Sequence, residues 1–199
     1  MKLEKKINWA ILVTGWGRNA TDTIQAYVNG KLKRSTIKLV VYQEEPCGAK
    51  EIAEQHGIET LKLVRADFND LLSYQKALTK VIKDRDIDFI FMLNYKYIIK
   101  DDMLRSFPNK IINIHPSLFP SFLATKTAIQ DAIDYGVKVT GITTHVIDDK
   151  IDEGLILCQK AIKVKDNDTF ETLYPKFAKH GKKIVLKTIQ KIENSFFGK

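Results

Sequence analysis

The chain of 199 residues is 44% hydrophobic and 28% charged, and it carries a formal net charge of +8. A chain of this length buries about 70% of its unfolded surface, so a sizeable core needs no disulfide. No segment reaches the roughly 18 apolar residues of a membrane-spanning helix. We therefore expect a globular protein with one domain, residues 1–199, and no membrane partner.

The positive charge has three interpretations. Nucleic-acid binding is one, but the lysines are scattered, with a mild excess in KFAKHGKK, and no basic stretch is interleaved with aromatic residues. A groove that attracts an anionic small molecule is the second, and a lysine-rich composition without functional meaning is the third. We predict an anionic small-molecule substrate and no nucleic-acid partner.

The two cysteines, Cys47 and Cys158, lie far apart in the sequence, without the spacing of a metal site. We therefore predict no metal site and a reducing, cytoplasmic setting. The start of the chain, MKLEKKINWAILVTGWG, has a basic segment, but its apolar run of about five residues is too short for a signal peptide. This run is better interpreted as a first buried strand.

Short apolar runs alternate with helical patterns through the first half of the chain. They predict strands at 9–13, 37–42, 59–64 and 87–93, and helices after the first glycine turn, at 47–57 and at 71–86. Continuous apolar strands joined by helices indicate a parallel sheet covered on both faces. The predicted fold class is therefore α/β.

The second half begins in the same way and then changes. A short helix at 100–107, a strand at 110–115 and a helix at 127–136 precede two strands with partial alternation, at 137–147 and 155–164. Residues 169–192 are predicted to form one or two helices. No linker, repeat or low-complexity stretch divides the chain.

A glycine turn follows the first predicted strand and consists of Gly15, Trp16, Gly17, Arg18 and Asn19. A strand that enters a helix through such a turn favours a bound anion, above all a phosphate, at the helix N-terminus. Arg18 would add a bidentate contact, and Asn19 would cap the helix or donate to the ligand. Alternatively, the glycines only make a tight turn. NAD or FAD is not expected, because Ala20 or Thr21 stands where the dinucleotide fingerprint needs a third glycine.

The sequence INIHPSLFPS, residues 112–121, places an amide and an imidazole two positions apart at a strand end. Because side chains alternate along a strand, Asn113 and His115 point to the same face, at the edge where α/β sheets bind ligands. Pro116 removes a donor and ends the strand. The pair would hold an oxyanion, and the imidazole would move a proton. The alternative is a structural histidine beside a proline turn.

A second polar stretch is THVIDDKIDEGLILCQ, residues 144–159. It holds His145 and an acidic turn with Asp148, Asp149, Asp152 and Glu153 between two predicted strands. Beside Asn113 and His115, this turn would supply a general base or a proton relay. It would otherwise be a solvated acidic hairpin, and the sequence alone does not bring the two stretches together.

Together, INIHPSLFPSF and VTGITTHVIDDKIDEGLILCQ resemble the folate-dependent formyltransferases. The resemblance extends to ILVTGWGRN, which is similar to the family's phosphate turn, and to AKEIAEQHGIET, which is similar to its second helix and next strand. It implies a mostly parallel twisted sheet with helices on both faces and a Rossmann-type N-terminal half. By length and architecture, the chain most resembles the branch that formylates phosphoribosylglycinamide (GAR) in purine biosynthesis.

The resemblance also implies a reaction. In this family an asparagine, a histidine and an aspartate perform the chemistry, and they match Asn113, His115 and Asp152. A formyl group would pass from the co-substrate 10-formyltetrahydrofolate to a primary amine. Asn113 and His115 would hold the tetrahedral oxyanion, and Asp152 would relay a proton through a water and keep His115 correctly charged. His145 is interpreted as a structural residue of the acidic loop.

The folate would lie between the loop after strand 87–93 and the acidic loop. The predicted folate-binding residues are Lys96, Tyr97, Ile98, Ile99, Ile147, Asp148 and Asp149. The predicted binding residues for the acceptor's phosphate are those of the glycine turn, from Gly15 to Asn19.

The sequence departs from the family mainly on the acceptor side. Arg18 stands where serine is expected, Leu123-Ala124 where a glycine is usual, and Gly181 where GAR enzymes have a glutamate on the ribose hydroxyls. GAR is therefore the best candidate acceptor, and an amino-sugar nucleotide is the alternative. A catalytically silent folate- or nucleotide-binding protein is a third interpretation. A monomer or homodimer is expected.

Overall fold

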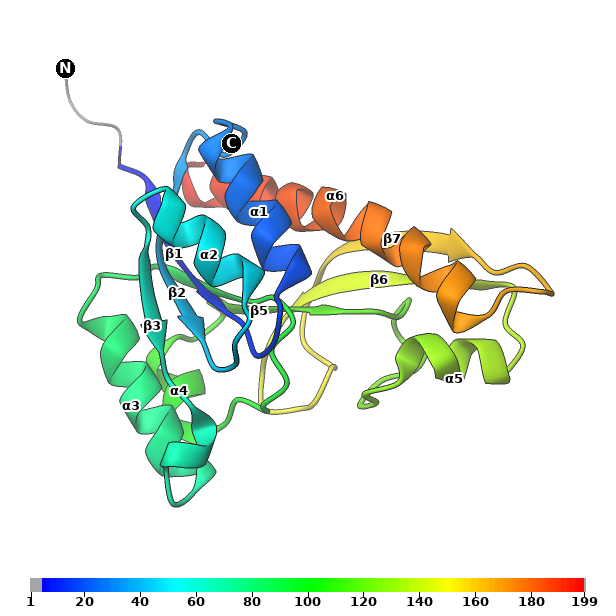
Figure 1. Cartoon of the computed structure of the whole chain (residues 1–199), viewed down its shortest axis with the longest axis horizontal. Coiled ribbons are helices and arrows are strands. Elements are labelled where there is room, and N and C mark those ends of the chain that lie inside the picture. Colours follow the sequence, from blue (N-terminus) through cyan, green and yellow to red (C-terminus); the bar gives the residue numbers. More distant parts are fainter. Residues whose placement is uncertain (1–4, 199) are drawn as a thin grey trace.

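The computed structural model describes residues 5–198 and is built on one seven-stranded sheet of order β3-β2-β1-β4-β5-β6-β7 (Figure 1). The first five strands are parallel, and β6 and β7 join the edge of β5 in antiparallel fashion. The predicted α/β class with a mostly parallel sheet is confirmed. The strands are β1 (Ile7–Leu12), β2 (Ser35–Tyr42), β3 (Glu59–Lys62), β4 (Phe89–Met92), β5 (Ile111–His115), β6 (Val139–Val146) and β7 (Ile156–Lys163).

The helices follow the predicted order, with shifted ends. The helix predicted to reach residue 86 ends at Lys83, because the next residues form a turn in which Asp86 takes a positive φ of 52°. The C-terminal stretch is a single helix that continues through Pro175 to Phe196. The helices are α1 (Arg18–Val28), α2 (Gly48–Gln55), α3 (Leu71–Lys83), α4 (Asp101–Ser106), α5 (Ala128–Asp134) and α6 (Phe170–Phe196), with a 3₁₀ turn at Arg65–Asp67.

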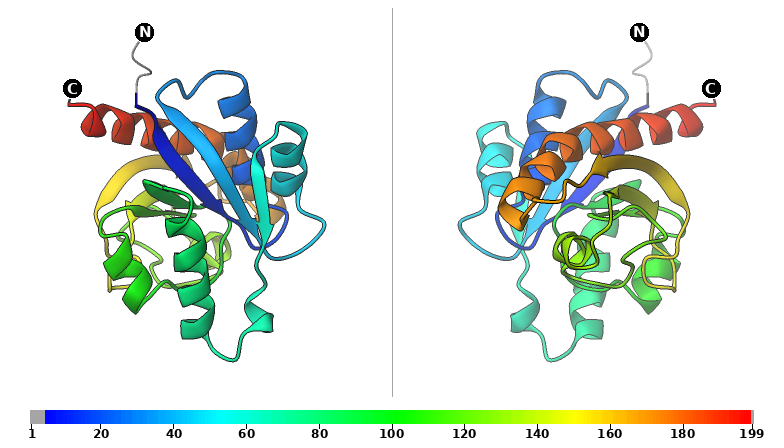
Figure 2. Two further views of the ribbon diagram at one scale, coloured as in Figure 1. Left: turned by 90° about the vertical axis from the view of Figure 1, so that its left-hand side faces the viewer. Right: turned by 90° about the vertical axis from the view of Figure 1, so that its right-hand side faces the viewer.

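Helices cover both faces of the sheet (Figures 1 and 2). Trp9 and Ile11 of β1 pack in one hydrophobic cluster with side chains of α1, α2 and α6. Ala10 and Leu12 point the other way and pack in a second cluster with side chains of α3 and α4. This alternation along a strand that is buried on both faces explains why its sequence is continuously apolar.

A third cluster lies where β6 and β7 extend beyond the parallel strands. It joins Ile129 of α5, Ile142 of β6, Ile162 of β7 and Phe177 of α6. In Figure 1, α6 runs from this region across β7 and continues beside α1. The first half of α6 is thereby placed near the carboxyl ends of the parallel strands.

The strand order determines where a ligand site is expected. The chain leaves β1 for β2 and β3 and then returns to β4 on the other side of β1. In open α/β sheets, ligands bind outside the carboxyl ends of the strands at such a reversal. The segments that follow β1, β4 and β5 meet at this edge.

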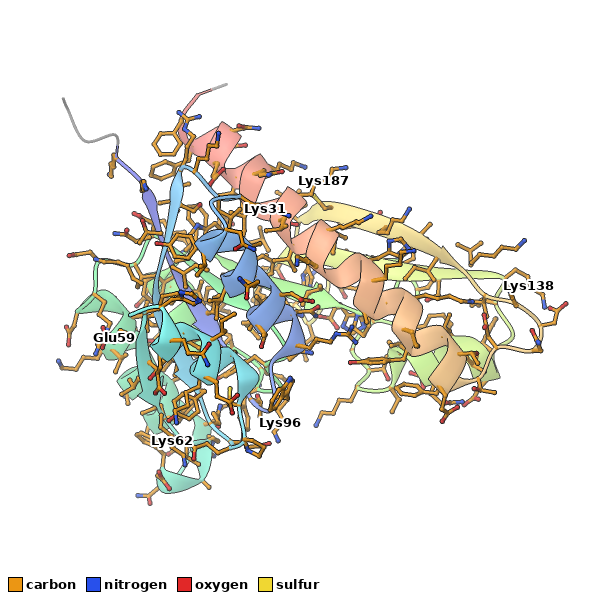
Figure 3. All side chains as sticks on the ribbon, turned by 45° about the horizontal axis from the view of Figure 1, so that its top comes forward. Lys31, Glu59, Lys62, Lys96, Lys138 and Lys187 are labelled. Atoms are coloured by element: carbon orange, nitrogen blue, oxygen red, sulfur yellow. The ribbon has the colours of Figure 1, made fainter. Side chains whose placement is uncertain are left out.

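The positive charge is distributed over several elements. In Figure 3, Lys62 and Lys138 lie far from each other and from Lys31 and Lys187. Within residues 5–198, no helix is both long and apolar enough to cross a membrane. Among the same residues, no group of three or more His, Cys, Asp or Glu side chains is arranged to hold a metal ion.

Candidate active site

A cavity of about 910 Å³ opens at the carboxyl ends of β1, β4 and β5. Its walls are the start of α1, residues 94–101, the end of β5, the segment before α5, the acidic loop and one side of α6. This volume is near the upper end of the range for small-molecule sites. The cavity therefore lies where the strand order predicts a ligand.

His145 fixes the side-chain amide of Asn113 at the floor of this cavity. The two residues are partners across the antiparallel pair of β5 and β6, and Nδ2 of Asn113 lies 3.3 Å from Nε2 of His145. Burial lowers the pKa of His145, although the carboxylate of Asp152 opposes this effect. Nδ1 of the neutral ring donates to the carbonyl of Val146 at 3.1 Å, so Nε2 accepts from Asn113. The second N–H of Asn113 is then available to a ligand.

His115 is held between a carboxylate and a carbonyl. Its Nδ1 lies 3.3 Å from Oδ2 of Asp152, and its Nε2 donates to the carbonyl of Phe122 at 2.9 Å. Both ring nitrogens therefore face oxygen acceptors. The ring is 6% exposed, so these contacts lie almost out of water, where charge pairing is strong.

Asp152 joins the parts of the site. Its Oδ1 lies 3.5 Å from Nε2 of His145, while Oδ2 faces His115 and accepts from the backbone N–H of Ala124 at 3.0 Å. Asp152, Phe122 and Ala124 all have positive φ angles, of 58°, 54° and 53°. Strained backbone of this kind costs about 1–3 kcal/mol per residue and gathers at functional sites.

The structure brings together the three residues that were predicted as catalytic. Asn113 and His115 point to the same face and line the cavity with Asp152, as the strand period predicts. His145, interpreted as a structural residue beside the acidic turn, lies in β6, within the strand predicted at 137–147, and contacts Asn113. The antiparallel register causes this contact, and no local sequence signal reveals the register.

The glycine turn contributes only its last two residues to the cavity lining. Arg18 and Asn19 line the cavity, whereas Gly15, Trp16 and Gly17 do not. Gly17 has φ +73°, and a Cβ there would lie 2.5 Å from Cγ1 of Val13, so the turn itself requires glycine. The indole of Trp16 packs over Gly48 at the start of α2. The glycines therefore fit the interpretation as a tight turn, and within the turn only Arg18 and Asn19 remain candidates for binding a phosphate.

Asn19 contacts α6 instead of capping α1. Gly17 is the N-cap of α1, and no side chain caps this helix. A Cβ on Gly181 would lie 2.5 Å from Oδ1 of Asn19, so the two residues pack closely where α1 and α6 meet. A larger residue at position 181 would displace Asn19. Gly181, at the position where a glutamate was expected, thus presents its backbone to Asn19.

Two loops form the wall that was predicted to bind folate. All seven predicted residues line the cavity: Lys96, Tyr97, Ile98, Ile99, Ile147, Asp148 and Asp149. The ammonium of Lys96 pairs with Oε1 of Glu44 at 2.7 Å, which joins this loop to the one after β2. Its backbone N–H donates to Oγ1 of Thr14 at 3.1 Å. The wall is thus fixed at its start to the segments after β1 and β2.

Charge is unevenly distributed around the cavity. Its lining carboxylates are Asp101, Asp148, Asp149 and Asp152. None of them lies on the α1–α6 side of the cavity, which is lined by Arg18, Asn19, Tyr174, Phe177, Ala178 and Gly181. Arg18 of α1 and Lys126, in the segment before α5, face the cavity together with Tyr174 of α6. Lys126 and Tyr174 were not predicted, because nothing in the sequence places residues 126 and 174 at the carboxyl ends of the strands. This side suits an anionic ligand.

The sequence model of the formyl transferase family matches residues 7–189. The chain belongs to this family. It is 30% identical to phosphoribosylglycinamide formyltransferase of Bacillus subtilis over 165 residues, which are 83% of this chain and 84% of that protein. The crystal structure of the enzyme of the same name from Bacillus halodurans has a TM-score of 0.87 at 30% identity and covers 93% of this chain and 94% of its own.

A longer relative contains the same domain. The chain is 31% identical over 172 residues to the trifunctional purine biosynthetic protein adenosine-3 of Bos taurus. The match covers 85% of this chain but only 16% of the trifunctional protein, so the chain spans about a sixth of that relative's length.

Proposed function

We propose that this formyl transferase moves the formyl group of 10-formyltetrahydrofolate to the primary amine of GAR. The convergence of Asn113, His115 and Asp152 in one cavity carries the proposal, with His145 holding the asparagine. The family match and the names of the relatives support the same donor and acceptor.

The cavity has a place for each substrate. The folate lies against the wall that contains Ile98 and Ile147, and the phosphate of the acceptor lies near Arg18 and Lys126. The donor's formyl group and the acceptor's amine then meet above Asn113, between the two walls. Binding both substrates in this way supplies the proximity that a bimolecular transfer needs.

The residues at the floor perform the transfer. The amine lone pair attacks the formyl carbon, a C–N bond forms, and the formyl oxygen becomes an oxyanion. The free N–H of Asn113 and the Nε2–H of His115, once His115 exchanges its Phe122 contact for the substrate, stabilise this charge. Asp152 takes the proton of the attacking nitrogen through a water and returns it to N10 of the folate, while the oxyanion re-forms the carbonyl and the bond between carbon and N10 breaks.

Steady-state kinetics with a histidine control test the proposal. Conversion of 10-formyltetrahydrofolate is followed by absorbance with GAR as acceptor, for the wild type, His115→Ala and His56→Ala. His56 is an exposed residue at the end of α2, outside the cavity lining. We expect turnover by the wild type and His56→Ala, and a loss of about 10²–10³-fold in kcat for His115→Ala. Folate binding without turnover of any amine would overturn the proposal and support a silent binding protein.

The packing of Gly181 against Asn19 favours a second candidate, an amino-sugar nucleotide as acceptor. The α1–α6 side has no carboxylate for ribose hydroxyls, and Tyr174 offers a ring at the rim of the cavity. The same assay with a panel of amino-sugar nucleotides decides between the acceptors. Turnover with a member of the panel and none with GAR would select the second candidate and retain the catalytic residues.

We also infer one domain and a cytoplasmic location. One sheet runs through all the strands of residues 5–198, and both cysteines are buried and free. Residues 1–4 and 199 of the predicted domain lie outside the described residues. The oligomeric state, monomer or homodimer, stays a prediction.

A further inference from the structure

Gln75 of α3 binds the backbone of residues 98–100, on the side of this segment away from the cavity. This segment belongs to the wall, residues 96–99 and 147–149, that is proposed to bind folate. The side chain of Gln75 is 2% exposed and is not part of the cavity lining. Its Nε2 donates to the carbonyl of Ile98 at 2.6 Å, and its Oε1 accepts from the backbone N–H of Lys100 at 3.1 Å. One buried amide thus satisfies two backbone groups of the wall.

These two contacts lie on either side of Ile99. In a parallel sheet, the carbonyl of one residue and the N–H of the residue two positions later bind the same residue of the neighbouring strand. The side-chain amide of Gln75 takes the place of such a strand residue for the carbonyl of Ile98 and the N–H of Lys100. The side chain of Ile99 is 3% exposed in the cluster with α3 and α4, while that of Ile98 is 46% exposed and lines the cavity. Both isoleucines line the cavity, so the brace holds a segment in which Ile99 is almost completely buried and only Ile98 is widely exposed to a ligand.

The residue before Gln75 holds the preceding part of the same wall. The hydroxyl of Tyr74 lies 2.8 Å from that of Tyr95 and accepts from Nε2 of Gln43 at 3.0 Å. Burial raises the pKa of Tyr74 to about 12 and also raises the pKa of Tyr95, so both remain neutral hydroxyls and one of them donates a hydrogen bond to the other. The ring of Tyr95 contacts that of Tyr97, with 5.6 Å between their centroids. Helix α3 thus holds the wall at two successive points.

We propose that Gln75 is a positioning residue for folate, acting through the backbone of residues 98–100 without touching the ligand. The inference rests on the proposed function, in which this wall binds the folate. Replacing the amide leaves two part-buried backbone groups, the carbonyl of Ile98 and the N–H of Lys100, without their protein partner, and the segment moves to find water or other partners. The α1–α6 side of the cavity has no contact with Gln75 and keeps its affinity for the acceptor.

Three variants separate this role from a general effect on folding. Gln75→Met keeps the length of the side chain and removes both hydrogen bonds. Gln190→Met makes the same change on the exposed side of α6 and serves as the control. We measure the Kd of tetrahydrofolate by equilibrium dialysis under reducing conditions, the KM of each substrate, kcat, and the Tm. For Gln75→Met we expect folate Kd and KM to rise about tenfold or more, and acceptor KM to stay within about twofold.

The third variant, Gln75→Glu, adds a readout that a loss of stability does not produce. A protonated glutamic acid donates through its O–H and accepts through its carbonyl, as the amide does, whereas the carboxylate only accepts and repels the carbonyl of Ile98. We expect the ratio of its folate Kd to that of the wild type to be large near pH 8 and to approach one as the pH falls. The wild type at each pH corrects for titration of the folate and of other groups.

The outcomes distinguish the inference from the function. The inference is overturned if Gln75→Met folds and has the folate Kd of the wild type, or if the Kd ratio for Gln75→Glu does not change with pH. Turnover by the wild type would in either case still support the proposed function. If Gln75→Met does not fold, the pH series of Gln75→Glu decides. A wild type that neither binds tetrahydrofolate nor uses 10-formyltetrahydrofolate overturns both.

Discussion

Asn113 and His145 face each other across β5 and β6, with 3.3 Å between the amide nitrogen and Nε2 of the ring. An isolated asparagine amide can rotate and present its oxygen or its nitrogen to a ligand. The neutral ring of His145, whose Nδ1 is bound to the carbonyl of Val146, accepts only the nitrogen. Asn113 is therefore oriented as a hydrogen-bond donor before any substrate binds, as a site for an oxyanion requires.

Loss of this donor is expected to affect catalysis more than binding. Asn113→Ala should lower kcat by about 10²–10³-fold and leave the KM of the folate nearly unchanged, because the oxyanion exists only during the reaction. Asn194→Ala, on an exposed part of α6, is the control. Steady-state kinetics with both substrates varied provide the measurement. A rise in folate KM with normal kcat would assign Asn113 to binding instead.

Neutral His145 should make the folded protein sensitive to acid. Its pKa in the folded protein lies below the ordinary value of 6.5, chiefly because of burial. As the pH falls through that value, the unfolded chain binds the proton first, so the free energy of unfolding decreases. Wild type should therefore lose stability relative to His145→Gln between about pH 7.5 and pH 5. Urea unfolding at a series of pH values measures the difference, and parallel curves for the two proteins would contradict it.

The sequence predicts the parts of the site that depend on local pattern. The period of a strand places Asn113 and His115 on one face, and the apolar runs predict every strand from β1 to β5 within a few residues. The contacts that complete the site join distant segments, and local pattern does not reveal them. The contact of His145 with Asn113 depends on the β5–β6 register, and that of Gly181 with Asn19 depends on the path of α6.

Glycine at position 181 is expected to matter for the acceptor and not for the folate. In Gly181→Ala the new methyl group would lie 2.5 Å from Oδ1 of Asn19 and would displace this side chain in the cavity wall. Alanine also favours a helix interior over glycine by about 1 kcal/mol, so the Tm should not fall. We expect a higher KM for the acceptor with unchanged KM for 10-formyltetrahydrofolate. Unchanged acceptor KM would show that Asn19 does not contact the substrate.

Ala124 offers a test of strain beside the catalytic aspartate. Its φ of 53° is unfavourable for alanine, and its backbone N–H donates to Oδ2 of Asp152 at 3.0 Å. In Ala124→Gly, relief of the left-handed conformation contributes about 1–2 kcal/mol and the greater freedom of the unfolded chain costs about 0.4–1 kcal/mol, so we expect a net gain between about 0 and about 1.6 kcal/mol.

Kinetics and a matched control complete this test. The backbone N–H is retained in Ala124→Gly, so kcat should equal that of the wild type. Ala161→Gly makes the same change at an exposed position of strand β7 and should lose about 0.5–1 kcal/mol, since glycine there is not compensated by relief of strain. Urea unfolding measures both variants at one pH. If Ala124→Gly were destabilised as much as Ala161→Gly, the left-handed conformation would cost nothing, and the contact between Ala124 and Asp152 would form without opposing strain.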